Sequence, residues 1–157
     1  MKVVGRRLLL LIVAGVSGGA ISTAADRPPF SITIGSPQDT WKVGSNVAIT
    51  IDIVNTSGQR ALFRKAPGQE EGELFMDVEV KDDLGRPLPR KPMGELISGG
   101  SVQKKFLKPG EALKDGIVVS KLFDLSRIGK YAIRVQRRDE GTNSVVTSNT
   151  ITVTVSD

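Results

Sequence analysis

The chain has 157 residues, of which 39% are apolar and 25% charged, the balance of an ordinary globular protein. It contains no His and no Cys, which excludes disulfides, His or Cys metal sites, thiol nucleophiles and any triad with an imidazole base. The net charge is +5, and without Lys2, Arg6 and Arg7 it falls to +2, from 19 basic and 17 acidic residues. A charge of +2 is too small to indicate a nucleic acid or an anionic membrane as the partner.

Residues 1–25 have the order of a secretory signal peptide. Basic residues come first, an apolar core follows at 8–16, and a stretch of small residues ends at Ala25. The alternative is an uncleaved membrane anchor, but a spanning helix needs about 20 mostly apolar residues, and 17–19 interrupt this run. We therefore expect cleavage near Ala25 and export to the periplasm or the exterior. Residues 26–157 would then form a single domain without a membrane contact.

Apolar and polar residues alternate through most of residues 30–155. Strict alternation is typical of strands with one buried and one solvated face. The pattern predicts strands at about residues 30–35, 46–54, 60–65, 74–81, 101–107, 114–120, 130–138 and 145–155. Residues 86–89 are expected to complete a hairpin through the turn at 82–85, and 121–128 to form at most a short helical turn.

The inward positions of these strands define a predicted core. Turn signals separate the strands at the spacing of a β-sandwich, so the inward rows of two sheets should meet. The predicted core residues are Ile32, Val47, Ile49, Ile51, Ile53, Val78, Val80, Tyr131, Ile133, Val135, Ile151 and Val153.

Several segments resemble secreted bacterial immunoglobulin-like domains. They are 44–49 leading into Asn55-Thr56-Ser57, 107–111, 122–126, 129–133 and the final strand at 148–155. The order N-T-S, D-x-x-G, L-x-P-G-E and G-x-Y is also similar to the bacterial intracellular proteinase inhibitor family, itself a β-sandwich. The resemblance implies an all-β, immunoglobulin-like antiparallel β-sandwich of about seven to eight strands.

The sequence predicts a structural place for two aromatic residues, Tyr131 and Trp41. Tyr131, the only tyrosine, begins a strand after Gly129 and resembles the tyrosine corner of Greek-key sandwiches. A ligand-stacking tyrosine is the alternative. Trp41, the only tryptophan, precedes a strand and is expected to plug the core or an edge, with an exposed binding anchor as the alternative.

Acidic residues gather in one part of the sequence. Their spacing fits no calcium loop, and no aromatic-lined cleft accompanies them as a glycosidase pair requires. A solvated strand face is favoured, and no catalytic residue, metal site or cofactor is expected. The residues are Glu70, Glu71, Glu73, Asp77, Glu79, Asp82 and Asp83.

Basic clusters occupy 86–91 and 103–105, and a further pair is Arg137-Arg138. We predict that they form solvated surface and protect edge strands, since lysine on an edge opposes aggregation. A patch for an anionic polymer is the alternative. Asn55-Thr56-Ser57 also matches a glycosylation sequon, although a turn that closes a strand explains the triplet.

Two long irregular segments, 66–73 and 90–100, are the candidate binding loops, because loops on a rigid scaffold often carry function. We expect a non-catalytic exported binding or accessory module whose partner is a protein of the cell envelope or exterior. A protease inhibitor that uses one of these loops is the main alternative, since Pro67 and Pro92 would stiffen them. An enzyme that uses carboxylates is the third.

Overall fold

The computed structural model describes residues 28–65, 76–92 and 103–157, which form an all-β structure with one short helix. Residues 1–25 lie outside this range, and among the described residues no helix is long and apolar enough to cross a membrane. The elements are β1 (Phe30–Gly35), β2 (Thr40–Lys42), β3 (Ala48–Asn55), β4 (Ala61–Lys65), β5 (Asp77–Lys81), β6 (Gln103–Leu107), β7 (Ala112–Val118), α1 (Val119–Leu122), β8 (Gly129–Arg138) and β9 (Val145–Ser156).

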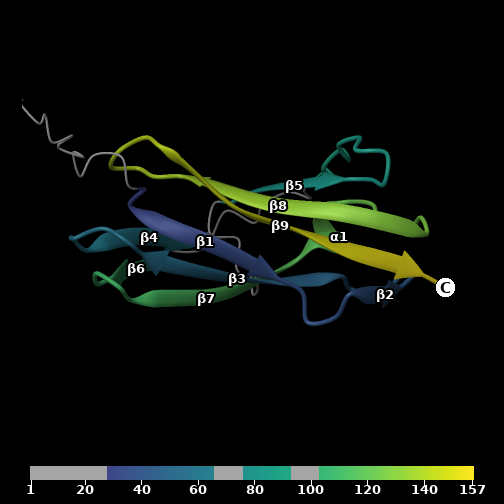
Figure 1. The fold of residues 1–157 in the computed structure, drawn as a ribbon, viewed down its shortest axis with the longest axis horizontal. Coiled ribbons are helices and arrows are strands. Elements are labelled where there is room, and N and C mark those ends of the chain that lie inside the picture. Colours follow the sequence, from purple (N-terminus) through teal and green to yellow (C-terminus); the bar gives the residue numbers. More distant parts are fainter. Residues whose placement is uncertain (1–27, 66–75, 93–102) are drawn as a thin grey trace, which may run out of the picture.

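The strands form two main sheets and a two-stranded ribbon. One sheet has the order β1-β3-β7, the second β2-β9-β8-β5, and the ribbon pairs β4 with β6. Figure 1 shows β5, β8 and β9 in one layer and β3, β4, β6 and β7 in the other. In an immunoglobulin fold, strands A, B and E share one sheet and strands C, F and G form the other. Here β1, β3 and β7 take the places of A, B and E, and β5, β8 and β9 those of C, F and G. The predicted immunoglobulin-like sandwich is confirmed.

The core lies between the facing rows of the two sheets. Ile51 and Ile53 of β3 and Ile133 and Val135 of β8 have no exposed surface, and burying such a side chain contributes about 1.5–3 kcal/mol. Ten of the twelve predicted core residues are buried. The other two, Val78 and Ile151, are partly exposed and pack against the core.

Strand β2 was not predicted from the sequence, because three residues are too few to show alternation. It forms through parallel pairing with the C-terminal part of β9, where Thr40 lies opposite Thr154 and Lys42 opposite Ser156. Trp41, between them, is half-buried and packs against the core. The prediction that Trp41 plugs an edge is therefore confirmed.

Residues 86–89 do not form the predicted strand. Pro87 makes one isolated bridge with Lys81, and the Leu88 N–H donates to the Val80 carbonyl at 2.8 Å. Pro87 and Pro89 lack the N–H groups that a longer ladder requires, so the pairing stops there.

The connection from β7 to β8 contains helix α1 and is bonded by Tyr131, the third residue of β8. The helix ends at Leu122 and so lies mostly before the expected turn at 121–128. The Tyr131 hydroxyl donates to the Arg127 carbonyl at 2.8 Å, which confirms the corner. Burial raises the pKa of Tyr131, so its hydroxyl remains a donor at neutral pH.

Candidate functional site

The β4–β6 ribbon presents one side to the core and the other to solvent. Cross-strand pairing places Leu62 opposite Phe106 and Arg64 opposite Lys104. These four alternate with inward residues such as the buried Phe63 and Leu107. We define the ribbon face as the outward residues together with the residue before β4. Its members are Arg60, Leu62, Arg64, Lys104 and Phe106.

An exposed aromatic ring lies at the centre of the ribbon face. Phe106 is 51% exposed, and the Arg60 guanidinium carbon lies 5.1 Å from its ring centroid. A cation over a ring at an exposed site contributes about 0.5–1 kcal/mol. The contact therefore holds an apolar surface and a positive charge side by side.

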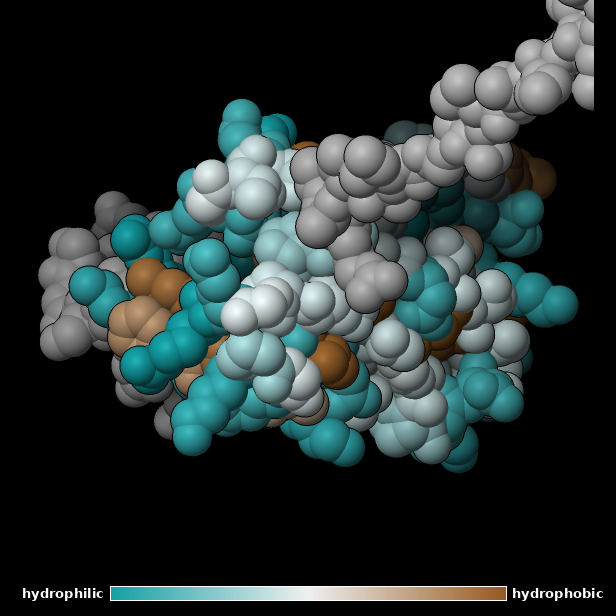
Figure 2. Space-filling model, turned by 60° about the vertical axis from the view of Figure 1, so that its left-hand side comes forward, coloured by the Kyte–Doolittle hydropathy of each residue, from teal (hydrophilic) through white to brown (hydrophobic). Residues whose placement is uncertain are grey.

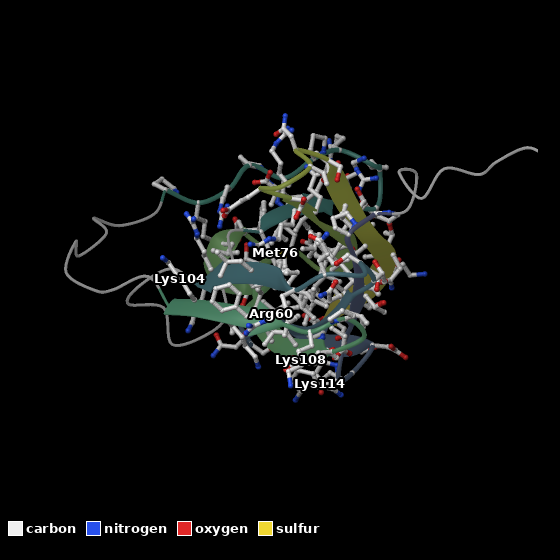
Figure 3. All side chains as sticks on the ribbon, turned by 90° about the vertical axis from the view of Figure 1, so that its left-hand side faces the viewer. Arg60, Met76, Lys104, Lys108 and Lys114 are labelled. Atoms are coloured by element: carbon white, nitrogen blue, oxygen red, sulfur yellow. The ribbon has the colours of Figure 1, made fainter. Side chains whose placement is uncertain are left out.

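The surroundings of the ribbon face are strongly basic. Residues 59–65 and 103–111 contain six Lys or Arg and one acidic residue, Glu111. Figure 3 shows Arg60, Lys104, Lys108 and Lys114 along one side of this end of the molecule. In Figure 2 the apolar residues of the visible surface form separate spots among hydrophilic ones. The candidate site is thus a small apolar centre with a cationic border.

Little of this charge is neutralised within the described part of the chain. Arg64 lies 3.4 Å from the Glu140 carboxylate, and Lys114 lies 3.8 Å from Asp52. Glu111 instead accepts the backbone N–H of Lys108 at 2.9 Å and closes a turn. Over residues 28–65, 76–92 and 103–157, no acidic side chain forms an ion pair with Lys104.

Beneath the ribbon, Arg137 is buried, which corrects the prediction that it forms solvated surface with Arg138. Only 4% of Arg137 is exposed, because the inward row of β8 continues through position 137. Its guanidinium carbon lies 4.9 Å from the centroid of the Phe63 ring, which packs edge-on against Phe30. Burial lowers the pKa of Arg137, and its Nη1 atom has no hydrogen-bond partner among the described residues.

Asn55 attaches the ribbon to the end of β3. Its side-chain amide donates to the carbonyls of Gln59 at 2.7 Å and Leu107 at 2.9 Å, and its Oδ1 accepts from the Ser57 backbone and hydroxyl. Asn55 is 1% exposed. The triplet therefore closes a strand, as predicted, and its asparagine is inaccessible to a glycan.

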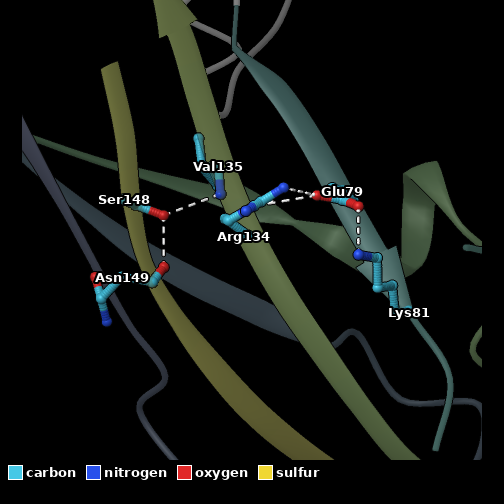
Figure 4. A network of polar contacts seen from close by, with 6 residues as sticks. All are labelled: Glu79, Lys81, Arg134, Val135, Ser148 and Asn149. Atoms are coloured by element: carbon cyan, nitrogen blue, oxygen red, sulfur yellow. Dashed lines mark hydrogen bonds and ion pairs between the residues drawn. The ribbon is translucent and has the colours of Figure 1, made fainter. Parts of the chain in front are cut away.

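Two described acidic residues of the predicted stretch, Glu79 and Asp82, pair with neighbouring cations. Glu79 accepts from Lys81 at 3.0 Å and from the Arg134 Nε at 3.1 Å, and these contacts lower its pKa (Figure 4). Asp82 accepts from the Arg86 Nε at 2.8 Å, which likewise lowers its pKa. Within the described residues no group of three or more acidic side chains is placed to hold a metal ion.

The acidic residues Glu70, Glu71 and Glu73 lie outside the described residues, as do the candidate loop 66–73 and most of 90–100. The first residues of the second loop are held against α1. Lys91 donates its backbone N–H to the Leu122 carbonyl at 2.7 Å and donates from its Nζ to the Ser120 carbonyl at 2.8 Å.

The ribbon face was not identified as a site from the sequence. Residues 60–64 and 104–106 are distant in the chain and meet only through the pairing of β4 with β6.

Fold and surface together define an immunoglobulin-like β-sandwich module with a basic, aromatic-centred face. No protein-family model matches the chain. It is 30% identical over 131 residues to an extracellular protease of Aeromonas hydrophila, in an alignment that covers 80% of this chain and 34% of that protein. The chain thus spans about a third of the length of this curated relative. An extracellular relative agrees with export; the predicted similarity to the proteinase inhibitor family receives no support from these comparisons.

The solved structures with some similarity to this backbone belong to proteins of different kinds. One is a CARDB domain from Pyrococcus furiosus in complex with di-metal ions, with 15% identity, a TM-score of 0.42, and coverage of 80% of this chain and 91% of that one. Another is a β-glucosidase from Erythrobacter marinus, with 12% identity, a TM-score of 0.43, and coverage of 81% and 15%. TM-scores this low add nothing to the argument from strand order.

Proposed function

We propose that the chain is a non-catalytic accessory module of the periplasm or cell exterior and acts through protein–protein contacts. The observation that carries this proposal is the alignment of 80% of the chain with 34% of an extracellular protease. If the relative consists of a catalytic domain joined to an accessory module, this chain would match only the module, which is a minor part of the whole protein.

The chemistry of the chain supports the same conclusion. Without His and Cys, acid–base or nucleophilic catalysis would have to rely mainly on carboxylates. Glu79 is bound to Lys81 and Arg134, and Asp82 to Arg86, which lowers the pKa of both carboxyl groups and makes them weak bases. The ribbon face, by contrast, contains Arg60, Arg64 and Phe106, and arginine and phenylalanine are enriched at protein interfaces.

A domain exchange tests the proposal. In the Aeromonas protease, the matched third is replaced by residues 26–157 of this chain, and export and cleavage of a short chromogenic peptide are measured. We expect export and peptide cleavage comparable to the parent, because the matched part would not contain the catalytic centre. A matched chimera with Ile133→Asp, which places a charge in the core, should fail to accumulate.

Two results would change the assignment. A folded chimera without peptide cleavage would mean that the matched third belongs to the catalytic unit. Stoichiometric inhibition of the parent protease by the separately added chain would instead favour the protease inhibitor, the second candidate from the sequence.

A further inference from the structure

We infer that the ribbon face binds an extended acidic protein segment in which carboxylates flank one apolar or aromatic residue. This inference rests on the proposed function and names the chemistry of the partner. It is carried by the alternation of charge and apolar surface along the two paired strands.

The spacing of the ribbon face sets the spacing of the segment. Leu62 and Phe106 lie opposite each other, and Arg64 and Lys104 form the next outward pair along the ribbon. Outward positions on a strand repeat every two residues, roughly 6.6–7 Å. Arg60 lies on the other side of the apolar pair. An extended segment of the pattern acid–x–apolar–x–acid therefore places each side chain over its complement.

Charge complementarity favours an acidic partner. Lys104 is exposed, and no acidic side chain among the described residues forms an ion pair with it. Arg60 lies over Phe106 and can still form hydrogen bonds with a carboxylate through the edge of its planar guanidinium. An acidic segment would be attracted to this surface before contact, which raises the association rate.

Edge protection by lysine explains only part of the arrangement. Protective charges on an edge strand oppose association, whereas a half-exposed phenylalanine at the centre of the same row favours it. Phe106 is 51% exposed although its neighbour Leu107 is fully buried. An apolar centre with a cationic border is typical of the few residues that dominate a protein interface.

The ribbon face is also held in place before any partner arrives. Asn55 bonds the Leu107 carbonyl on the inner side of the ribbon, and Phe63 packs on Phe30. Arg60 is already stacked on Phe106. A partner would therefore meet a fixed ribbon and a stacked Arg60–Phe106 pair that need little further ordering, which reduces the entropic cost of binding.

The test uses a fluorescent peptide with the sequence Glu-Ser-Trp-Ser-Glu within a Gly-Ser frame, titrated with the exported chain at low ionic strength. We expect saturable binding that weakens as salt is added. Serine in place of tryptophan, or lysine in place of both glutamates, should each weaken binding about tenfold or more. Heparin serves as the anionic polymer for comparison.

Variants of the chain locate the site. Lys104→Glu should weaken binding of the peptide about tenfold, whereas Lys130→Glu, the same charge change at an exposed position of β8, should leave it unchanged. Phe106→Ser should abolish the preference for the tryptophan peptide over the serine peptide. Phe106 is exposed, so this variant should lose only the contact with Arg60 and lower the thermal midpoint, which is measured alongside, by no more than a few degrees.

Three outcomes would overturn the inference. The first is no binding of the acidic tryptophan peptide, and the second is an equal loss of peptide affinity with Lys104→Glu and Lys130→Glu. The third is heparin binding that is tighter than peptide binding and independent of Phe106. The last would assign the surface to anionic polymers. The domain exchange does not depend on these side chains. Failure of the peptide alone therefore removes this inference, and failure of the chimera alone removes the accessory role.

Discussion

The side-chain amide of Asn149 pairs with the backbone of Ile34 as a neighbouring strand would. Its Oδ1 accepts the Ile34 N–H at 2.8 Å, and its Nδ2 donates to the Ile34 carbonyl at 3.0 Å. Ile34 lies in β1 and Asn149 in β9, so one side chain joins the two sheets. A β-bulge makes this possible, because Ser148 and Asn149 together lie opposite Val135, whose N–H donates to the Ser148 hydroxyl (Figure 4).

Replacing Asn149 with alanine should lower the free energy of unfolding by about 1–3 kcal/mol, because both backbone groups of Ile34 lose their partner. Urea denaturation of the two proteins measures the difference. Asn46→Ala, at an exposed position, is the control and should change stability by less than about 0.5 kcal/mol. Equal effects of the two substitutions would show that the amide does not join the sheets.

Replacing Tyr131 with phenylalanine should cost about 0.5–1.5 kcal/mol, since the ring still fills the core but the bond to the Arg127 carbonyl is lost. The measurement is the denaturation midpoint at constant m-value. An unchanged midpoint would show that the hydrogen bond of the tyrosine corner does not stabilise the protein.

Replacing Asn55 with alanine should destabilise the protein by about 2–4 kcal/mol, because it leaves the buried Leu107 carbonyl without its amide donor and opens the turn at 55–59. Hydrogen exchange should also show faster exchange in β4 and β6 than in β8. Uniform exchange throughout the variant would disprove the specific attachment of the ribbon through Asn55.

Replacing Arg137 with methionine should raise the free energy of unfolding by about 1 kcal/mol or more. Methionine keeps the packing on Phe63 and removes a buried charge that forms no ion pair with a described acidic side chain and that Glu140 and Asp139 attract only from a longer distance. The lost contact with the ring offsets part of the gain. Arg138→Met, at the exposed neighbouring position, is the control. A strongly destabilised Arg137→Met protein would refute this view and point to a partner for the guanidinium.

Replacing Glu79 with glutamine should cost about 0.2–1 kcal/mol at pH 7, the range for exposed ion pairs. Lys81 and Arg134 lower the pKa of Glu79. Its contribution is therefore complete above the unfolded-state value of about 4.3, and it is lost as the pH falls through the lower folded-state pKa. Thermal midpoints of the two proteins should differ at pH 7 and converge near pH 2. Asp77→Asn on the same strand is the control, and a difference that persists at acid pH would contradict the assignment.

The alternation of apolar residues was sufficient to predict the sandwich, eight of its strands and most of its core. A strand of five or more residues repeats its side-chain direction every second position, so a partly buried sheet leaves its period in the sequence. The tyrosine corner was predictable because it is local in the chain: the Tyr131 hydroxyl bonds the carbonyl of Arg127, only four positions before it.

Features that depend on contacts between distant segments required the tertiary structure. Strand β2 exists only through pairing with β9, and the contact between Arg137 and the Phe63 ring joins β8 to β4 across 74 positions of the chain. The ribbon face assembles Arg60 and Phe106, which are 46 positions apart in the chain. Local periodicity determined which residues point inward, but only the packing of sheets and ribbon decided which charged and aromatic side chains share a surface.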